Sequence, residues 1–531
     1  MLAQKGELDS KEIVIEKDRK IELPESERIF EKINFDVPRE QFPEQEYEFK
    51  VESTLKLGEM NPKLKLQSAK EAEKESGKNG RAKFGFGNYF TFLGGLDYGQ
   101  KSSEKFSYDL KYHHLSSQRG AVDGKNSSSS GNLAEVNGNY FLKSGSISAK
   151  AGLERTVNKF YGYDKNLGEI DDEKLKIVSP LLYTQFNNRL NLKDTQTVLN
   201  SNLGFYHLNI NRLKNTETEI LASHQGDSRL KSDLMLSWSF EGSSISRKVV
   251  ESSVNRHFVL ADVKMLKKLN AFEFEGGLRF ASSGDTISSA KSVYLYPLAN
   301  IKYHVVPKAL MLEIGYGGTL EKNTLRTFTR EILWLDTSTV IQHNNRKNDL
   351  YGFAQSNISN SVFAKTGFEI RRYDNFHFFS NDPERREILN AVYDKGNVRM
   401  TNILVEIGLV KEKFRSSLSG KYTTWNNDIL QEPIHFPTYQ ARWNSTISFA
   451  KKLNFSLDAY VLGGIKYFDN DENKIKPLND IVDVNLKVDY NFSSRVGVFL
   501  MLDNIFGQKY ERYRHYSVRG IQVLFGLQTL F

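Results

Sequence analysis

The sequence contains no cysteine, and it has no apolar run of the roughly 18 residues that a transmembrane helix requires. The lack of cysteine excludes disulfide frameworks, thiolate metal sites and cysteine nucleophiles, and it is compatible with export. The lack of long apolar runs, together with a hydrophobic content of 39%, argues against a helical membrane protein. A transmembrane β-barrel is still allowed, because only every second residue of its strands meets lipid.

Motifs for catalysis and metal binding are also missing. The sequence has no serine nucleophile elbow and no zinc-protease motif. His113 and His114 are adjacent, so on a strand they point to opposite faces and cannot chelate one metal ion together. Residues 469–473 begin like a calcium loop, but Lys474 stands where the turn needs glycine and Asp480 where a bidentate glutamate is expected. We therefore predict a protein that is not an enzyme and that has no cofactor and no metal site.

One large unit follows the first 80 residues. The chain has 531 residues, yet no shift in composition divides residues 81–531, so we predict one domain there. The net charge of +8 is spread along the chain rather than gathered in a stripe, which argues against nucleic-acid binding. The aromatic content of 12% suits the aromatic girdles of a membrane barrel.

Residues 521–531 alternate as a strand with one apolar face. That face carries Ile521, Val523, Phe525, Leu527, Thr529 and Phe531, and the opposite face includes Gln522, Gly526 and Gln528. An apolar outer face and a more polar inner face are typical of a membrane β-barrel. We interpret the terminal aromatic, Phe531, as a barrel C-terminal signal.

The same alternation recurs along the chain. Phe106, Tyr108, Leu110 and Tyr112 alternate with Asp109 and Lys111, and Val482, Val484, Leu486 and Val488 alternate with Asp483 and Lys487. A face that carries Asp and Lys side chains must meet water. We therefore predict that Lys105, Asp109, Lys111, Asp483 and Lys487 face the lumen. An earlier strand is predicted over residues 84–92, with Phe84, Phe86, Phe90 and Phe92 on one face.

Connections of two lengths separate the predicted strands. Tight turns such as residues 491–494 alternate with longer polar connections such as 118–131, 324–349 and 428–438, a rhythm of periplasmic turns and extracellular loops. About 21 candidate strands can be counted, and a closed antiparallel barrel normally has an even number, so about 20 to 22 are predicted. The alternative is a soluble all-β protein, which needs a second apolar face or covering helices, and the sequence shows neither. The predicted fold class is all-β, a large antiparallel transmembrane β-barrel.

Residues 1–80 differ from the rest of the chain. They are dense in Glu and Lys and are interrupted by proline, so we predict a charged periplasmic arm or linker that is partly disordered.

The end of the chain carries a distinctive set of residues, Asp503-Asn504-Ile505-Phe506-Gly507-Gln508-Lys509-Tyr510, then Tyr513, Gly520 and Phe531. This set resembles the last two strands of TonB-dependent outer-membrane receptors. More loosely, residues 85–89, 114–117 and 161–164 are similar to receptor-like barrels of Bacteroidetes. The resemblance implies an outer-membrane location, with outer-membrane lipid around the barrel, and a lumen that is used for uptake or is blocked by another element.

Receptors of this family carry a plug domain before the barrel, and the segment of about 80 residues here is too short for a complete one. Within it, Glu12, Ile13, Val14 and Ile15 resemble a TonB box, which pairs with TonB by strand addition. A short apolar run in a charged arm would look the same.

Two functions fit these observations. In the first, the barrel is an outer-membrane receptor-like protein for uptake or passage of a solute, and the lumen-facing candidates set its selectivity. In the second, it is a non-transporting scaffold subunit of an outer-membrane assembly or secretion complex, and the charged arm reaches periplasmic or outer-membrane protein partners. We favour the first function because the resemblance is to receptors.

Overall fold

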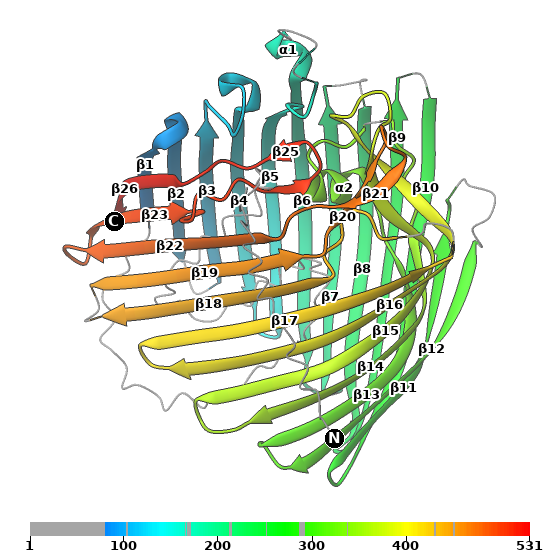
Figure 1. Ribbon diagram of the computed structural model, residues 1–531. Coiled ribbons are helices and arrows are strands. Elements are labelled where there is room, and N and C mark those ends of the chain that lie inside the picture. Colours follow the sequence, from blue (N-terminus) through cyan, green and yellow to red (C-terminus); the bar gives the residue numbers. More distant parts are fainter. Residues whose placement is uncertain are drawn as a thin grey trace, which may run out of the picture.

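A computed structural model describes residues 80–101, 105–164, 166, 171–211, 215–250, 252–285, 292–336, 338–428, 432–449 and 452–531. In these residues, 22 antiparallel strands form one closed sheet, in which β1 pairs with both β2 and β26 (Figure 1). The predicted all-β barrel and its predicted strand number are confirmed. Among the described residues, no helix has the length and apolar character needed to cross a membrane.

The barrel strands follow one another around the ring in chain order. They are β1 (Gly80–Gly87), β2 (Thr91–Lys101), β3 (Phe106–Ser117), β4 (Ser129–Leu142), β5 (Gly145–Lys159), β6 (Lys176–Leu192), β7 (Thr197–Ile210), β8 (Asn215–Lys231), β9 (Leu234–Val249), β10 (Ser252–Leu269), β11 (Phe272–Ser283), β12 (Val293–Val306), β13 (Leu310–Glu321), β14 (Asn344–Asn357), β15 (Val362–Asn381), β16 (Leu389–Lys411), β17 (Phe414–Asn427), β18 (Tyr439–Phe449), β19 (Leu453–Gly463), β22 (Ile481–Asn491), β23 (Val496–Asp503) and β26 (Gln522–Leu530).

The connecting segments contain the remaining elements. These are the 3₁₀ turns η1 (Asn88–Phe90) and η2 (Gly124–Ser127), the short helices α1 (Asp172–Leu175) and α2 (Leu325–Glu331), and the hairpins β20 (Lys466–Asp469) with β21 (Lys474–Pro477) and β24 (Glu511–Tyr513) with β25 (Tyr516–Ser517).

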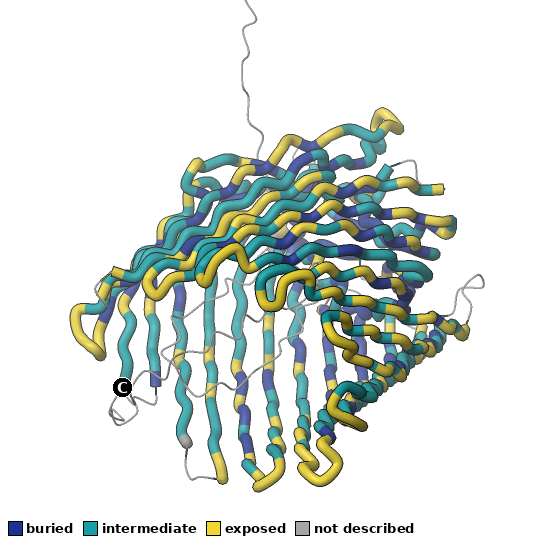
Figure 2. Tube along the Cα trace, turned by 90° about the horizontal axis from the view of Figure 1, so that it is seen from below, coloured by how far each residue is buried: buried dark blue, intermediate teal, exposed yellow. Residues whose placement is uncertain are grey.

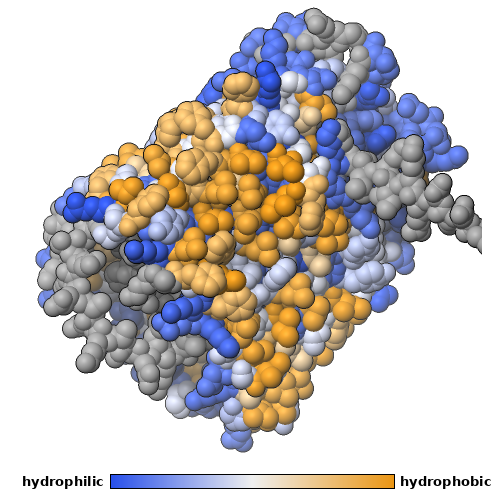
Figure 3. All heavy atoms as spheres, turned by 60° about the vertical axis from the view of Figure 1, so that its left-hand side comes forward, coloured by the Kyte–Doolittle hydropathy of each residue, from blue (hydrophilic) through white to orange (hydrophobic). Residues whose placement is uncertain are grey.

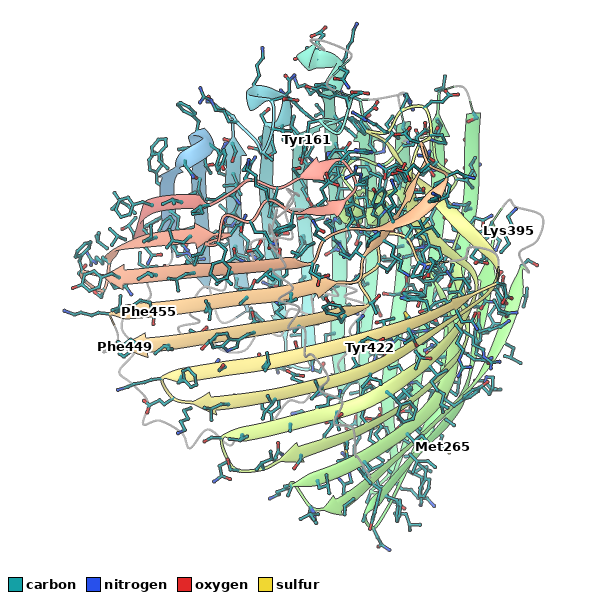
Figure 4. All side chains as sticks on the ribbon, in the orientation of Figure 1. Tyr161, Met265, Lys395, Tyr422, Phe449 and Phe455 are labelled. Carbon is teal, nitrogen blue, oxygen red and sulfur yellow. The ribbon has the colours of Figure 1, made fainter. Side chains whose placement is uncertain are left out.

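An apolar belt covers the outside of the barrel. On β26, the side chains of Phe525 and Leu527 are 55% and 54% exposed, whereas Leu524, on the opposite face of the same strand, is 8% exposed. Exposed and buried residues alternate in this way along most strands (Figure 2), and apolar side chains cover a broad band of the face in Figure 3. Phe449 and Phe455, on β18 and β19, pack edge to face with ring centroids 5.9 Å apart near one margin of the barrel (Figure 4). The predicted apolar-out pattern is confirmed.

The two ends of the barrel differ. At one end the strands are joined by short turns, and there Gly80 donates to the carbonyl of the C-terminal Phe531 and accepts from its N–H, at 2.8 and 2.9 Å. At the other end lie the long connections, among them residues 118–128, 322–343 and 504–521. The chain thus enters and leaves the barrel at the short-turn end, and its long loops gather at the long-loop end.

The predicted strand over residues 84–92 is wrong. The 3₁₀ turn η1 reverses the chain there, so Phe86 and Phe92 are cross-strand partners on β1 and β2. Tyr89 and Phe90 adopt left-handed backbone conformations, with φ of 56° and 52°. Because the turn returns the chain with its aromatic residues on the same face, the alternation of the sequence continues unbroken and cannot reveal the turn.

Asn88 stabilises this tight turn. Its side-chain amide donates to the carbonyl of Ile521 at 2.7 Å and its side-chain oxygen accepts from the N–H of Val523 at 2.9 Å. The Asn88 side chain thereby continues the ladder between β1 and β26 past the last backbone pair of β1.

We expect Gly526→Val to prevent barrel closure. A Cβ on Gly526 would lie 2.3 Å from the Phe84 carbonyl oxygen and 2.3 Å from the Phe499 ring, so β26 could not approach β1. The cost should exceed the roughly 1–3 kcal/mol of ordinary overpacking, because one neighbour is backbone. Electrophoresis of unheated samples in SDS, which separates folded from unfolded barrel, measures the folded fraction.

Gly276→Val on β11 is the matched control for this variant, because a Cβ there meets no described atom within 4 Å. The control should leave the folded fraction unchanged. Equal folding of the two variants would contradict the role of the close approach at Gly526.

Candidate functional site

The connection between β13 and β14, here called the mouth loop (residues 322–343), covers part of the long-loop end. Its helix α2 lies within the ring of strands rather than above it (Figure 1). The mouth loop shares a buried apolar cluster with the ends of β5, β6 and β7, with β15 and β16, and with the β24–β25 hairpin. It is therefore packed against several sides of the barrel mouth.

The start of α2 is determined by local capping and by one wall residue. Thr324 and Thr327 form a reciprocal capping box. Glu217 on β8, which is 3% exposed, accepts hydrogen bonds from the N–H groups of Leu325 and Arg326 at 2.8 and 3.2 Å. A carboxylate at a helix N-terminus satisfies free N–H donors and interacts favourably with the helix dipole. The wall of the barrel thus fixes where α2 begins.

Buried ion pairs join the mouth loop to the wall, and we call them the latch. Glu219 on β8 accepts from Lys322 at 2.8 Å and from Arg326 at 2.6 Å. Lys322 also lies 2.7 Å from Glu241 on β9. Removal of one partner from a buried pair leaves the other charge uncompensated, so loss of Glu219 would destabilise the packed mouth loop.

Aromatic side chains pack the rest of the mouth loop. The rings of Trp334 and Tyr516 stack with centroids 3.7 Å apart, and Tyr161 meets Tyr516 edge to face at 5.0 Å. The indole N–H of Trp334 donates to the carbonyl of Lys159 at 3.0 Å. Tyr161, labelled in Figure 4, lies at the long-loop end beside the β24–β25 hairpin. These contacts join three segments that are far apart in the sequence.

His435 links the same hairpin to the barrel wall. Its Nδ1 donates to the Phe379 carbonyl on β15 at 2.7 Å, and its Nε2 accepts from the N–H of Arg514 at 3.3 Å. Burial lowers the pKa of His435 to about 4. The imidazole is therefore neutral at pH 7, and both of its nitrogen atoms have partners.

A pocket of about 320 Å³ opens between these loops. It is lined by Val122, Tyr161, Gly162, Tyr163, Asp164, Asn166, Arg386, Glu511, His515 and Ser517. The residues come from four separate long connections at the mouth. The pocket is the candidate functional site, because four long connections build it and its Tyr161 contacts Trp334 of the mouth loop.

Phenols, carboxylates and a guanidinium group meet in this pocket. Arg386 pairs with Asp164 at 3.0 Å, and the Tyr163 hydroxyl donates to Asp123 at 2.9 Å. Burial raises the pKa of Tyr163 and of Glu511, and burial together with neighbouring arginines lowers the pKa of His515 to about 3. The pocket offers hydrogen-bond donors and acceptors beside aromatic rings, which suits a polar solute with an apolar part.

Metal ligands do not gather at the mouth or elsewhere in the described ranges, where no group of three or more His, Cys, Asp or Glu side chains could hold a metal ion. In the loop that begins like a calcium site, the carboxylates form salt bridges instead, because Asp469 and Glu472 both pair with Lys476. His113 bonds Asp97 and His114 bonds Asn132, on opposite faces of β3.

Two of the five predicted lumen residues lie together on β3. Asp109 accepts from the Asn137 side chain at 3.0 Å, and Lys111 lies 3.7 Å from Glu135. Both are on the face opposite Leu110, which is 43% exposed on the outside.

The other predicted residues lie apart from this pair. On β22, Asp483 is fully buried and accepts from the hydroxyls of Tyr460 and Tyr510, and Lys487 pairs with Asp489 at 2.6 Å. Lys105 is exposed in the turn before β3. None of the five lines the mouth pocket.

Two further sequence predictions concern the chain ends. The Phe531 side chain is 53% exposed at the short-turn end, and its role as a signal stays a prediction. The TonB-box-like residues Glu12, Ile13, Val14 and Ile15 lie outside the described residues, as does the predicted arm up to residue 79.

Sequence reasoning missed the latch and the mouth pocket. Glu217 and Glu219 alternate with Thr216 and Thr218, so two acidic residues on one strand face were visible. Their partners are more than 100 positions away in the mouth loop, and no local pattern connects them. Residues 161–164 resemble receptor-like barrels, but that resemblance does not predict a pocket.

Comparisons with solved structures show the same fold. The FrpB iron transporter from Neisseria meningitidis (F3-3 variant) matches with a TM-score of 0.68 at 10% identity, covering 85% of this chain and 81% of that one. The siderophore receptor PirA from Acinetobacter baumannii gives 0.65 at 11% identity, with 85% and 80% covered. The ferric-catecholate import receptor Fiu from E. coli K12, in a closed form, gives 0.63 at 10% identity, with 85% and 81% covered.

No protein-family model and no curated protein sequence matches the chain. The closed barrel, its apolar belt and the fold that it shares with outer-membrane receptors agree with the expected outer-membrane location. The Bacteroidetes type and the lack of a complete plug stay predictions.

Acidification should loosen the β24–β25 hairpin. The pKa of His435 is lowered from 6.5 to about 4 when it is packed, so the packed form is fully stabilised above pH 6.5 and loses stability as the pH falls toward 4. At pH 5 the loss is about 2 kcal/mol, which raises local opening roughly 30-fold. Hydrogen exchange of peptides from residues 510–518, referenced to a β16 peptide, measures it. In His435→Gln the pH dependence should shrink, and an unchanged dependence would contradict the assignment to His435.

Proposed function

We propose that this protein is an outer-membrane receptor-like barrel that binds a solute in the mouth pocket and passes it through the lumen. The observation that carries this proposal is the pocket itself, which several long loops build at one mouth of a 22-stranded barrel. A barrel of this strand number has a lumen wider than its own side chains can fill. Binding and passage account for these features without catalysis.

The latch gives this proposal a gating step. The ion pairs of Glu219 with Lys322 and Arg326 join the mouth loop to β8. We propose that in this position the loop blocks the route from the pocket to the lumen. A solute can pass only when the latch releases. Once the mouth loop moves, its buried charges gain water, so part of the lost Coulomb energy is recovered by hydration.

The lumen and the N-terminal arm extend the proposal. Lys105, Asp109, Lys111, Asp483 and Lys487 are proposed to influence which ions and solutes pass. The arm of residues 1–80 is proposed to reach protein partners on the periplasmic side, with Glu12 to Ile15 pairing with TonB by strand addition.

Glu219→Gln should open the barrel. The variant removes both ion pairs of Glu219, and loss of one buried partner costs about 3–5 kcal/mol in typical cases, so the open probability should rise by at least about tenfold. Single-channel conductance in planar bilayers measures this directly. Glu313→Gln is the control, because Glu313 pairs only across the wall, with Lys302 and Asn300, among the partners shown for it.

The outcomes separate the two functions. Rare openings in the wild type and frequent openings in Glu219→Gln support gated passage. Large and steady conductance of the wild type would contradict closure by the latch. Absence of conductance in both proteins, together with a stoichiometric co-purifying partner, would overturn the transport proposal in favour of a scaffold.

Lumen charge reversal should change ion selectivity. In the Glu219→Gln background, Lys111→Glu with Lys487→Glu adds negative charge beside Glu135 and Asp489, so the reversal potential in a KCl gradient should move toward cation selectivity. Lys413→Glu, in an exposed turn between β16 and β17, is the control and should have no effect. An unchanged reversal potential would show that these lysines do not line the conducting path.

A further inference from the structure

The ladder between β12 and β13 is incomplete. The two strands pair from Val306 and Leu310 up to Ala299 and Tyr316, and there the pairing stops. Beyond it, β12 continues to Val293 paired only with β11, and β13 continues to Glu321 paired only with β14. In the part of the chain that the structure describes, the β13 side of Val293–Leu298 therefore has no partner strand. We call this split the seam (Figure 1).

Pro297 accounts for the point at which the ladder stops. The N–H of Ser283 donates to the carbonyl of Ser292, and the N–H of His304 donates to the carbonyl of Ala271. The even-numbered residues of β12 therefore direct their backbone hydrogen bonds toward β11. Odd-numbered residues therefore direct their backbone groups toward β13. Pro297 would be the next to pair there, and proline has no N–H to donate. The missing N–H costs no hydrogen bond to β11, because odd-numbered residues of β12 make none there.

Gly318 is the residue that would face Pro297. Its carbonyl instead accepts from the Arg279 guanidinium at 3.0 Å, and the register of β13 with β14 shifts beside it. A Cβ on Gly318 would lie 2.4 Å from the ring of Tyr296 and 2.8 Å from the Lys347 carbonyl oxygen. Only glycine allows β13 to pass this close behind β12.

Above the split, β13 leans to the lumen side of β12. Leu320 packs into a buried cluster with Phe258, Ala281 and Tyr296, the inward-facing residues of β10, β11 and β12. The Tyr296 hydroxyl donates to Asn345 on β14 at 2.7 Å. The free edge of β12 thus lies on the outer side of β13 and β14, which continue the wall.

A second pocket, of about 150 Å³, lies where the strands separate. It is lined by Lys264, Glu275, Arg279, Leu298, Ala299, Asn300, Tyr316, Gly317, Gly318, Arg346, Asp349 and Tyr351. Ala299 and Tyr316 belong to the outer, lipid-facing surface, whereas Arg279 and Arg346 belong to the inner, charged one. The pocket therefore touches both sides of the wall.

The seam lies within the apolar belt. Leu295 and Val293 on its free edge are 65% and 53% exposed, and Ala299 pairs with Gly276, midway between the exposed Phe272 and Phe280. Unpaired backbone groups are costly against lipid, so water or the polar part of a ligand must meet this edge. Apolar flanks outside and charged groups inside are the two halves that an amphiphile requires.

We propose that the seam is a lateral portal for an amphiphile from the outer half of the membrane, whose phosphate-bearing headgroup enters the pocket while its acyl chain stays on Leu295 and Tyr316. Each cation of the pocket pairs with a carboxylate, Arg279 with Asp262 at 2.6 Å, Lys264 with Glu275 at 3.2 Å and Arg346 with Asp349 at 3.2 Å. The pocket therefore offers both signs of charge, which suits a headgroup whose phosphate is accompanied by an amine. The proposal goes beyond passage through the mouth, since the route crosses the wall.

The absence of cysteine allows a direct test. Ala299→Cys places a thiol at the pocket, and Leu278→Cys places one on β11 beside Pro297, where both ladders are intact. Each variant is reconstituted in phospholipid vesicles that contain a phosphatidylethanolamine with a maleimide on its headgroup. A headgroup reaches a thiol this deep in the belt only through the seam. We expect tagging at Ala299→Cys to exceed that at Leu278→Cys by about tenfold or more, since exclusion of headgroups from hydrocarbon is the only protection that differs.

Two further variants, both made in Ala299→Cys, test the cause. Pro297→Val restores an N–H that can pair with Gly318, so tagging should fall several-fold. Tyr296→Phe removes the hydrogen bond to Asn345, so tagging should rise. Equal tagging at the two cysteine positions would overturn the portal. Labelling by a water-soluble maleimide without lipid tagging would also overturn it, because the seam would then be a water-filled gap that admits no lipid.

The test is independent of the proposed function. Lipid tagging requires no conductance and no latch release, so a barrel that fails as a solute conduit can still pass as a lipid portal. Conversely, if no lipid tagging occurs, the portal is overturned, but an increased conductance of Glu219→Gln would still support gated passage through the mouth.

Discussion

Closure of the backbone hydrogen-bond ladder is the constraint on which the rest of this structure depends. In hydrocarbon, an unpaired backbone group has no water to replace its partner, so a sheet can span a membrane only when its first and last strands meet. Here β1 meets β26, and the pairing needs Gly526, where no side chain fits between the strands. Asn88 then continues the ladder with its side chain after the backbone turns away. The barrel and its lumen follow from this closure.

The same constraint gives meaning to the place where it is relaxed. A proline within a barrel strand is expected at an edge, because its nitrogen cannot donate. Pro297 lies at such an edge on β12, and Gly318 lets the neighbouring strand retreat toward the lumen. Arg279 then occupies the carbonyl that the proline cannot serve. Three residues from three strands thus contribute to the same interruption of the ladder, which argues that it is a specific feature of this fold rather than an isolated irregularity.

The fold could be predicted from the sequence because alternation is a local property. Phe525 and Leu527 are separated by one residue, and most barrel strands repeat that spacing, so fold class and approximate strand number needed no long-range information. The turn at Asn88 was missed because it preserves the alternation. The mouth pocket and the latch were missed for another reason. Glu219 meets Arg326 across 107 positions, and such pairs depend on the closed topology rather than on any spacing in the chain.

The mouth loop is held by two kinds of contact that respond differently to change. Trp334 and Tyr516 contribute apolar contact, which weakens only when the rings separate. Glu219, Lys322 and Arg326 contribute charge pairs whose loss is partly offset by hydration once water enters. A loop closed by apolar packing alone would have to expose its whole surface before it yielded. In the gating that we propose, the charge pairs at the start of α2 are where opening begins, because water and a charged solute can compete there for the same partners.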